Sequence, residues 1–151
     1  MGPISSFTQG RIALAGEVTW TFPALLDATD TDIIVTRARA EFTELTDLSY
    51  GSIDISRGAS IHVGKVTNFN GGSLFAGAGT EIHLPKVTSY SHAGTGRGQH
   101  RYLRATGVGA LIDLSGVTTV TGGTYDNDRI FIEAFNGGTV DLQNVASIKD
   151  R

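Results

Sequence analysis

Acidic and histidine side chains recur at one position of a repeated sequence unit, where they could transfer protons or bind a metal ion. This position is occupied by Glu41, His62, His83, Asp113 and Asp141. Imidazole and carboxylate groups are common proton carriers and metal ligands in proteins. On an exposed face the same groups form a solvated polar ladder, in which water screens like charges. We expect the solvated ladder, without a metal or catalytic site.

A second set of polar and aromatic side chains lies in and beside two stretches, 91–104 and 122–129, that interrupt the repeat. Aromatic rings there could stack on a sugar ring or a peptide, whereas opposite charges on neighbouring loops more often pair with each other. The candidate ligand-binding residues are Tyr90, His92, Arg97, His100, Arg101, Tyr102, Arg104, Tyr125, Asp126 and Asp128. The two aspartates resemble the start of a calcium loop, but its glycine and distal glutamate are not at their places. No cofactor is therefore expected, and Ca²⁺ remains an alternative.

Motifs that name a reaction do not occur in this chain. The sequence contains no phosphate-binding P-loop, no G-x-S-x-G nucleophile elbow and no H-E-x-x-H zinc motif. The sequence therefore predicts a protein that is not an enzyme.

The repeat that positions all these residues is clearest in LIDLSGVTTVTGG, residues 111–123. An apolar anchor recurs every 20 to 30 residues, at Leu25, Leu45, Val66, Val87, Val117 and Val145. Apolar residues also recur five and three positions before each anchor and three positions after it, which indicates two short strands joined by a corner. The longer intervals place insertions after the fourth and fifth copies.

A repeat of about twenty residues with strand periodicity predicts an all-β fold, a parallel β-solenoid in which each copy makes one coil. We expect about six coils, stacked roughly 4.8 Å apart so that equivalent residues lie side by side. A left-handed hexapeptide helix follows a stricter six-residue rhythm, so the right-handed form is favoured.

The copies DLSGVTTVTGG, HLPKVTSY and DLQNVASI resemble the imperfect repeats of right-handed parallel β-helices in bacterial surface, adhesin-like and polysaccharide-active proteins. The resemblance covers nearly the whole chain and implies an extracellular or cell-surface location. Polysaccharide lyases and hydrolases with this fold use acidic pairs, in some cases with Ca²⁺. Here the aspartates and the arginines fall in different columns, which makes such an enzyme fragment the third alternative.

Composition excludes several other classes of function. The net charge is −3, which gives no electrostatic case for binding nucleic acid, and there is no cysteine for a disulfide or a thiolate metal site. Twenty glycines and a charged fraction of 18% suit stacked strands and corners. No apolar run is long enough to span a membrane as a helix.

The two ends suggest how coils could meet. Residues 1–10 are expected to form a polar segment or partial cap, and residues 11–151 a single solenoid domain. No capping element follows the last coil, so we expect either a longer chain or head-to-tail association with another copy. The residues expected at that contact are Trp20, Phe22, Leu142, Val145 and Ile148. Residues 1–10 folded over the first coil would block this growth.

Together these features favour a non-enzymatic structural or adhesive segment of an extracellular or surface protein, which associates end to end. The runner-up is a carbohydrate-binding module that uses the two insertions.

Overall fold

The computed structural model describes residues 3–92, 94 and 96–149. Ala93 and Thr95, in the first predicted insertion, lie outside the described residues, as do residues 1–2 and 150–151. Every helix or strand in the described part is a β-strand. The prediction of an all-β chain is therefore confirmed.

The strands are three to seven residues long, and some of them, such as β3 and β12, are rich in β-branched side chains, which fit a pleated sheet. They are β1 (Gly10–Ala15), β2 (Thr19–Thr21), β3 (Thr31–Thr36), β4 (Arg39–Glu41), β5 (Ser52–Ser56), β6 (Ser60–His62), β7 (Ser73–Ala76), β8 (Glu81–His83), β9 (Ser89–Ser91), β10 (His100–Thr106), β11 (Leu111–Asp113), β12 (Thr119–Thr121), β13 (Arg129–Phe135), β14 (Thr139–Asp141) and β15 (Ser147–Lys149).

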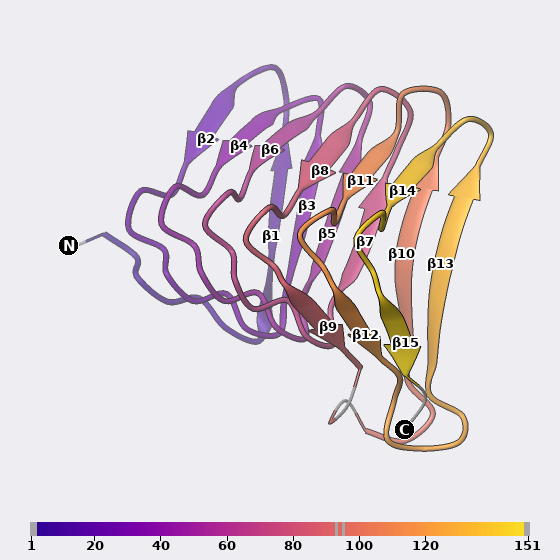
Figure 1. Ribbon diagram of the computed structural model, residues 1–151. Helices are drawn as coiled ribbons and strands as arrows, with labels where there is room; N and C mark the ends of the chain where they lie inside the picture. Colours follow the sequence, from indigo (N-terminus) through magenta and orange to yellow (C-terminus); the bar gives the residue numbers. More distant parts are fainter. Residues whose placement is uncertain (1–2, 93, 95, 150–151) are drawn as a thin grey trace.

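The strands form four sheets, and each strand pairs in parallel with the equivalent strand of a neighbouring repeat (Figure 1). The largest sheet has the order β1-β3-β5-β7-β10-β13. The three-stranded sheets are β2-β4-β6, β8-β11-β14 and β9-β12-β15. Successive strands along the chain lie in different sheets, and the chain returns to the large sheet once in each repeat. The expected parallel arrangement is thus present.

Strand register brings together the apolar columns that the sequence predicts. In the large sheet, Ile33, Ile53, Leu74 and Leu103 are successive register partners, and none of these side chains is exposed. In the smaller sheets, Ile82, Ile112 and Val140 are paired in the same way. Burial of these side chains removes apolar surface from water, which is the main favourable term in folding. The core is therefore one continuous column inside the sheets.

The first repeat differs from the others at Trp20, which stands in the apolar column five positions before the anchor but is not buried. Trp20 lies in β2, which has β4 as its only strand partner among the described residues, and the side chain is 44% exposed. Phe22 packs against the core instead, with its ring stacked on Phe42 at 4.7 Å between centroids. The indole is exposed because no repeat covers this side of β2 in the described chain.

The first insertion is shorter than the predicted 91–104. Residues His100–Thr106 form β10, with Leu103 and Ala105 buried in the core. The alternation of inward and outward side chains continues through this stretch, so its last residues belong to the large sheet. The loop itself lies between β9 and β10, and the second insertion ends where β13 begins at Arg129.

Residues 4–9, which we call the N-terminal strap, lie along the first repeat. Phe7 N–H donates to Asp27 O at 2.9 Å, and Gln9 N–H donates to Thr29 O at 3.0 Å. Ser6 and Asp27 form a parallel bridge, and the Phe7 ring packs against the core. The strap therefore extends the parallel ladder by one short segment.

Candidate functional site

The two loops that interrupt the repeat are held together by Asp128. Its Oδ1 accepts the Gln99 N–H at 3.0 Å, and its Oδ2 accepts the Tyr125 N–H at 2.9 Å. Burial alone would raise the pKa of Asp128, but these backbone hydrogen bonds outweigh it and hold the pKa below its ordinary value. The carboxylate thus fixes one loop against the other.

Further contacts join the same loops. The Arg97 guanidinium lies over the Tyr125 ring, 5.2 Å from its centroid, and the Gly94 N–H donates to the Thr124 hydroxyl at 3.3 Å. His92 Nε2 lies 2.8 Å from Gln99 O, which also accepts the Arg129 N–H. The structure therefore brings the two predicted stretches into one region.

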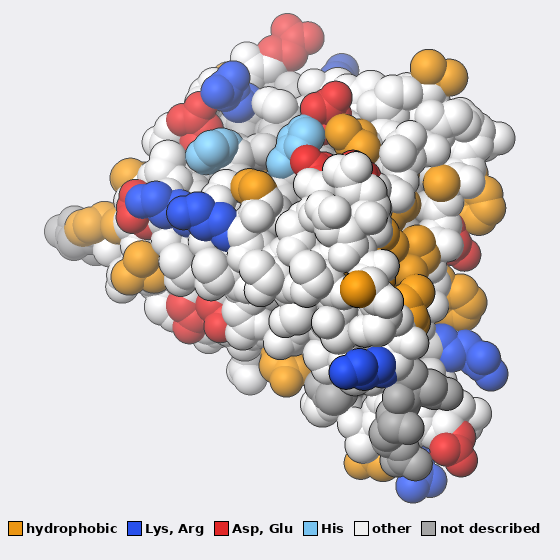
Figure 2. All heavy atoms as spheres, viewed as in Figure 1, with side chains coloured by type: hydrophobic (Ala, Val, Ile, Leu, Met, Phe, Trp, Pro, Cys, Tyr) orange, Lys and Arg blue, Asp and Glu red, His pale blue; other side chains and the backbone are white. Residues whose placement is uncertain are grey.

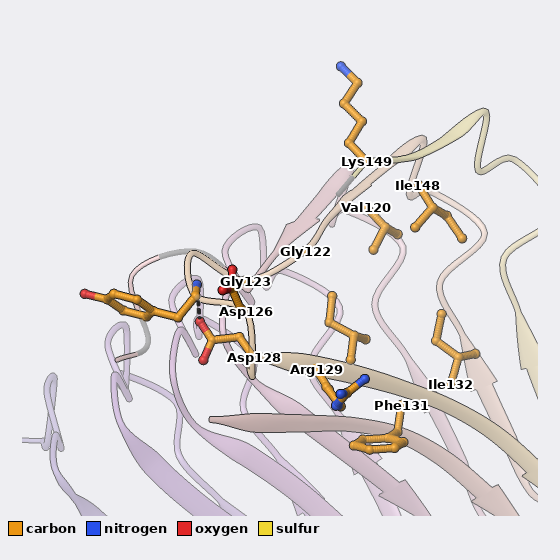
Figure 3. A pocket seen from close by; sticks show the side chains of 12 residues that line it. Val120, Gly122, Gly123, Asp126, Asp128, Arg129, Phe131, Ile132, Ile148 and Lys149 are labelled. Atoms are coloured by element: carbon orange, nitrogen blue, oxygen red, sulfur yellow. Dashed lines mark hydrogen bonds between the residues drawn. The ribbon is translucent and has the colours of Figure 1, made fainter. Parts of the chain in front are cut away.

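A hollow of 730 Å³ opens beside these loops. Its apolar wall comes from three strands, with Val120 on β12, Ile148 on β15 and Ile132 on β13, and Figure 3 shows these side chains around one open space. Arg129 and Asp128 stand at the loop side of the hollow. The hollow is thus the uncovered inside of the last repeat, bordered by a polar loop.

Two of the candidate ligand-binding residues are not on the surface. Tyr90 is 1% exposed, and its hydroxyl donates to Gly72 O at 2.7 Å, while His92 has no exposed surface. Burial raises the pKa of Tyr90, which keeps the phenol neutral and able to donate. Tyr90 occupies the same apolar column as Val120 and Ile148, and this column position explains its burial.

Other candidates lie on the outer face of the large sheet. Tyr102 stacks on Phe131 with 5.1 Å between ring centroids, and the Arg104 guanidinium lies 4.9 Å from the Tyr102 centroid. Arg104 also pairs with Glu133 at 2.5 Å. The rings and charges on this face are thus engaged mainly with one another.

The remaining candidates border these groups. His100 contacts Phe131 edge to face at 5.5 Å, and Arg101 donates to Gly71 O. Asp126 lines the hollow. In the described part of the chain, no three His, Cys, Asp or Glu side chains are grouped so that they could hold a metal ion.

The polar ladder lies across two of the small sheets. Glu41 is the register partner of His62, and Asp113 is the register partner of both His83 and Asp141. Figure 2 shows imidazoles among acidic and basic side chains on this face of the molecule. Members of the predicted column are therefore neighbours within each of the two sheets.

His83 lies between two carboxylates within this row. Its Nδ1 is 2.9 Å from Asp113 Oδ2, and its Nε2 is 2.8 Å from Glu81 Oε2. The hydrogen bond with Asp113, and then the one with Glu81, raise the pKa of His83. The Ser115 hydrogen bonds and the His83 partner hold the pKa of Asp113 below its usual value. Sequence reasoning missed Glu81, which lies outside the predicted column.

The pKa of His83 makes a pH-dependent prediction. Because the folded-state pKa is raised, its stabilisation is fully present below about pH 6.5 and is lost as pH rises through the folded value. Between pH 5.5 and pH 8.5 we therefore expect the unfolding free energy of the wild type to fall by about 0.2–1 kcal/mol through this residue. The His83→Gln variant should lack this decrease. Urea unfolding at both pH values measures this difference. His62→Gln is the matched control, because the imidazole–carboxylate hydrogen bonds of the described ladder belong to His83. An equal change of the pH dependence in both variants would contradict the assignment of this effect to His83.

A second polar row was also missed, although its signal is in the sequence. Asp47 forms one parallel bridge with Asp27 and another with Asn68. Asp47 Oδ1 accepts the Ser49 N–H at 2.9 Å and hydroxyl at 2.6 Å, and Asn68 donates to Asp47 Oδ2 at 3.0 Å. An acidic or amide residue followed two positions later by a hydrogen-bonding residue is typical of such turns. The row closes the corners of the first repeats.

Comparison with known proteins gives no relative. No family model, no curated protein and no solved structure matches the chain. Among the described residues, no helix is long and apolar enough to cross a membrane. The function therefore has to be argued from the geometry of the chain itself.

Proposed function

We propose that this chain is a non-enzymatic structural or adhesive segment of an extracellular or surface protein, built as a right-handed parallel β-solenoid of six coils. The observation that carries this proposal is the repeated parallel register. Equivalent residues of successive repeats pair in each sheet, so the molecule is extended by adding repeats along one axis. Parallel crossover connections are almost always right-handed, which supports this hand.

Several polar groups support a structural role because they pair with other groups of the chain. Asp128 bonds two loop amides, Arg104 pairs with Glu133, and Asp47 bonds neighbouring repeats. A catalytic carboxylate or imidazole needs a free approach to substrate. These side chains instead join loops and repeats of the chain to one another.

Carbohydrate binding is the second candidate, and the joined loops favour it. Tyr125 is 40% exposed beside the hollow, with the Arg97 guanidinium against its ring. An exposed aromatic ring beside donors and acceptors is suited to stacking on a sugar. Tyr102 and Arg104 offer less, because Phe131 and Glu133 already engage them.

Binding of the chain to a glycan array separates the two functions. For a structural segment we expect no specific glycan signal and no cleavage of the bound polysaccharides. A signal that Tyr125→Ala abolishes would contradict the structural proposal and support the carbohydrate-binding one. Val108→Ala is the matched control, because Val108 is an 80% exposed apolar residue that does not line the hollow.

A further inference from the structure

Three of the four sheets end at the C-terminal end of the repeats in a strand whose outer edge has no strand partner in the described chain. β13, β14 and β15 pair only with β10, β11 and β12, respectively. The side chains at this end include Ile132, Phe135 and Ile148, which are 40%, 47% and 68% exposed. A row of unpaired backbone groups beside apolar side chains is a template for another strand. We call this set of strands the last edge.

The opposite end offers a related surface, which we call the first edge. β1 and β2 pair only with β3 and β4 among the described strands. A hollow of 250 Å³ at this end is lined by Ile12, Phe22 and Leu25, with Phe7 of the strap beside them. Both edges therefore combine unpaired parallel strands with an apolar interior.

The strap shows that the first edge accepts a parallel segment. Leu26 N–H donates to Ser5 O at 2.9 Å, and the strap donates back from Phe7 and Gln9. The next pair of repeats repeats the pattern, with Ala28 N–H donating to Asp47 O at 2.9 Å and Asp30 N–H to Ser49 O at 2.8 Å. Since Ser6 pairs with Asp27, Phe7 falls in line with Ala28. Each repeat has three sides, its two strands or strand positions and a third segment, which in the first repeat is residues 25–30. The strap thus stands where an earlier repeat would place its third side.

We propose that the last edge of one molecule binds the first edge of a second copy, and that the strap of the second copy must detach for this to happen. This inference rests on the solenoid architecture of the proposed function and names the partner that extends it. β1 then pairs with β13, β2 meets β14, and residues 25–30 lie on β15. In this arrangement β15 of the first molecule takes the place of the strap of the second copy.

Continued register makes the two edges complementary. The apolar columns would be extended by Ile132 with Ile12, Ala134 with Leu14, Val140 with Trp20, Leu142 with Phe22, Val145 with Leu25 and Ile148 with Ala28. Each pair joins two apolar residues, so the contact would bury both hollows and the exposed indole. These pairs include all five contact residues expected from the sequence.

The charges at the two edges are also compatible. In the same register, Arg11 faces Phe131, Glu133 faces Ala13 and Asp141 faces Thr21, so none of these three charged residues is directly opposed by a like charge. One face of the Phe131 ring is stacked on Tyr102, and a guanidinium on its other side would repeat the contact of Arg104 with Tyr102. The charges of these three residues therefore do not oppose the binding of a second copy.

The strap has to move because it occupies the third side one layer too early. With the strap resting on β15 of the other molecule, β1 and β13 would be two strand spacings apart, about 9.6 Å, which is too far for ladder hydrogen bonds. With the strap detached, β1 lies one strand spacing, about 4.8 Å, from β13, and residues 25–30 lie one spacing from β15. The strap therefore lowers the fraction of molecules that can associate, and the apparent affinity falls with that fraction.

The first test opens the strap in the full chain. Phe7→Pro with Gln9→Pro removes the two N–H donors and the Phe7 ring, and proline cannot adopt the φ of 55° seen at Gln9. The matched control is Thr8→Pro, because alternate N–H groups of a strand point to opposite sides and that of Thr8 faces away from residues 26–30. In sedimentation velocity across a concentration series, we expect the open variant to associate with an apparent Kd at least about tenfold below that of the wild type and the control.

The second test establishes polarity in the strap-open chain. Ile12→Lys blocks the first edge and Ile132→Lys blocks the last edge, so each variant alone should remain monomeric. An equal mixture should give a one-to-one dimer that does not grow, because joining two different surfaces leaves only blocked ends. Dimerisation of Ile12→Lys by itself would show that last edges pair with each other and would overturn the proposal.

A strap-open chain that stays monomeric at the highest concentration, with an unchanged circular-dichroism spectrum, would also overturn it. Phe7→Ser is the second strap-open variant, because it removes the Phe7 ring and keeps the backbone N–H. It must also increase association relative to the wild type. Failure of these tests leaves the glycan-array result untouched. A self-association failure is therefore distinguishable from failure of the structural function.

Discussion

Replacing Ile55 by aspartate should abolish the cooperative folded state of the chain. Ile55 has no exposed surface and lies between Val35 and Ala76 in the core column. A carboxylate there would be buried without an ion partner or a hydrogen bond, and the free energy cost of such burial exceeds several kcal/mol. Because domains are stable by only about 5–15 kcal/mol, one such change is sufficient. We expect loss of the strand signal in far-UV circular dichroism.

The matched control for this change is Ser56→Asp. Ser56 is the next residue of β5, and it faces the outer side of the large sheet in register with Thr36. A carboxylate on this outward, half-buried position should change the unfolding free energy by no more than about 0.5 kcal/mol. A folded Ile55→Asp variant, or equal damage from both substitutions, would contradict the assignment of the two faces of β5.

Gly51→Ala is expected to produce the second large effect, a loss of about 1–3 kcal/mol in unfolding free energy. A Cβ at position 51 would lie 2.4 Å from Thr31 O and 3.2 Å from the Leu48 Cδ1. The carbonyl belongs to the backbone of the preceding repeat, so the two repeats would have to separate locally. Close stacking of repeats thus requires glycine at this corner.

Gly64→Ala provides the comparison for Gly51. A Cβ at position 64 would meet only the His62 ring, at 3.4 Å, which is ordinary contact. Alanine there should be neutral or stabilise the fold by up to about 1 kcal/mol, because it restricts the unfolded chain. Urea unfolding of both variants measures the contrast, and an equal loss in the two would show that repeat spacing is not what limits position 51.

The apolar columns made most of the architecture predictable from sequence. Ile82, Ile112 and Val140 were aligned by their distance from the anchors, and the strands pair them directly. Strand periodicity has this power because side chains alternate strictly between two faces. The same columns place Tyr90 in the core. Its expected role as a ligand-binding residue on the surface is therefore wrong, because the side chain is buried.

Other features depended on contacts that no column contains. Glu81 reaches His83 from the neighbouring outward position of the same strand, and Asp128 bonds amides of a loop about thirty residues away. The exposed Trp20 depends on which repeats are present to cover it, which an apolar pattern does not report. Loop conformation is set by such local hydrogen bonds, so spacing alone located the loops without giving their geometry.

An engineered disulfide between neighbouring strands tests the parallel register between repeats. Ser52 and Ser73 are register partners on β5 and β7, and the chain has no cysteine of its own. Parallel neighbours about 4.8 Å apart are within the Cα separation that a disulfide spans. Ser52→Cys with Ser73→Cys should therefore oxidise to an intramolecular disulfide in the folded chain.

The comparison pair is Ser52→Cys with Ser60→Cys, which are closer in sequence but lie on strands of two different sheets. Mass spectrometry of the oxidised, folded proteins gives the cross-linked fraction of each. The parallel stacking of repeats predicts near-complete cross-linking of the 52–73 pair and little of the 52–60 pair. Preferential cross-linking of 52–60, or none in 52–73, would contradict it.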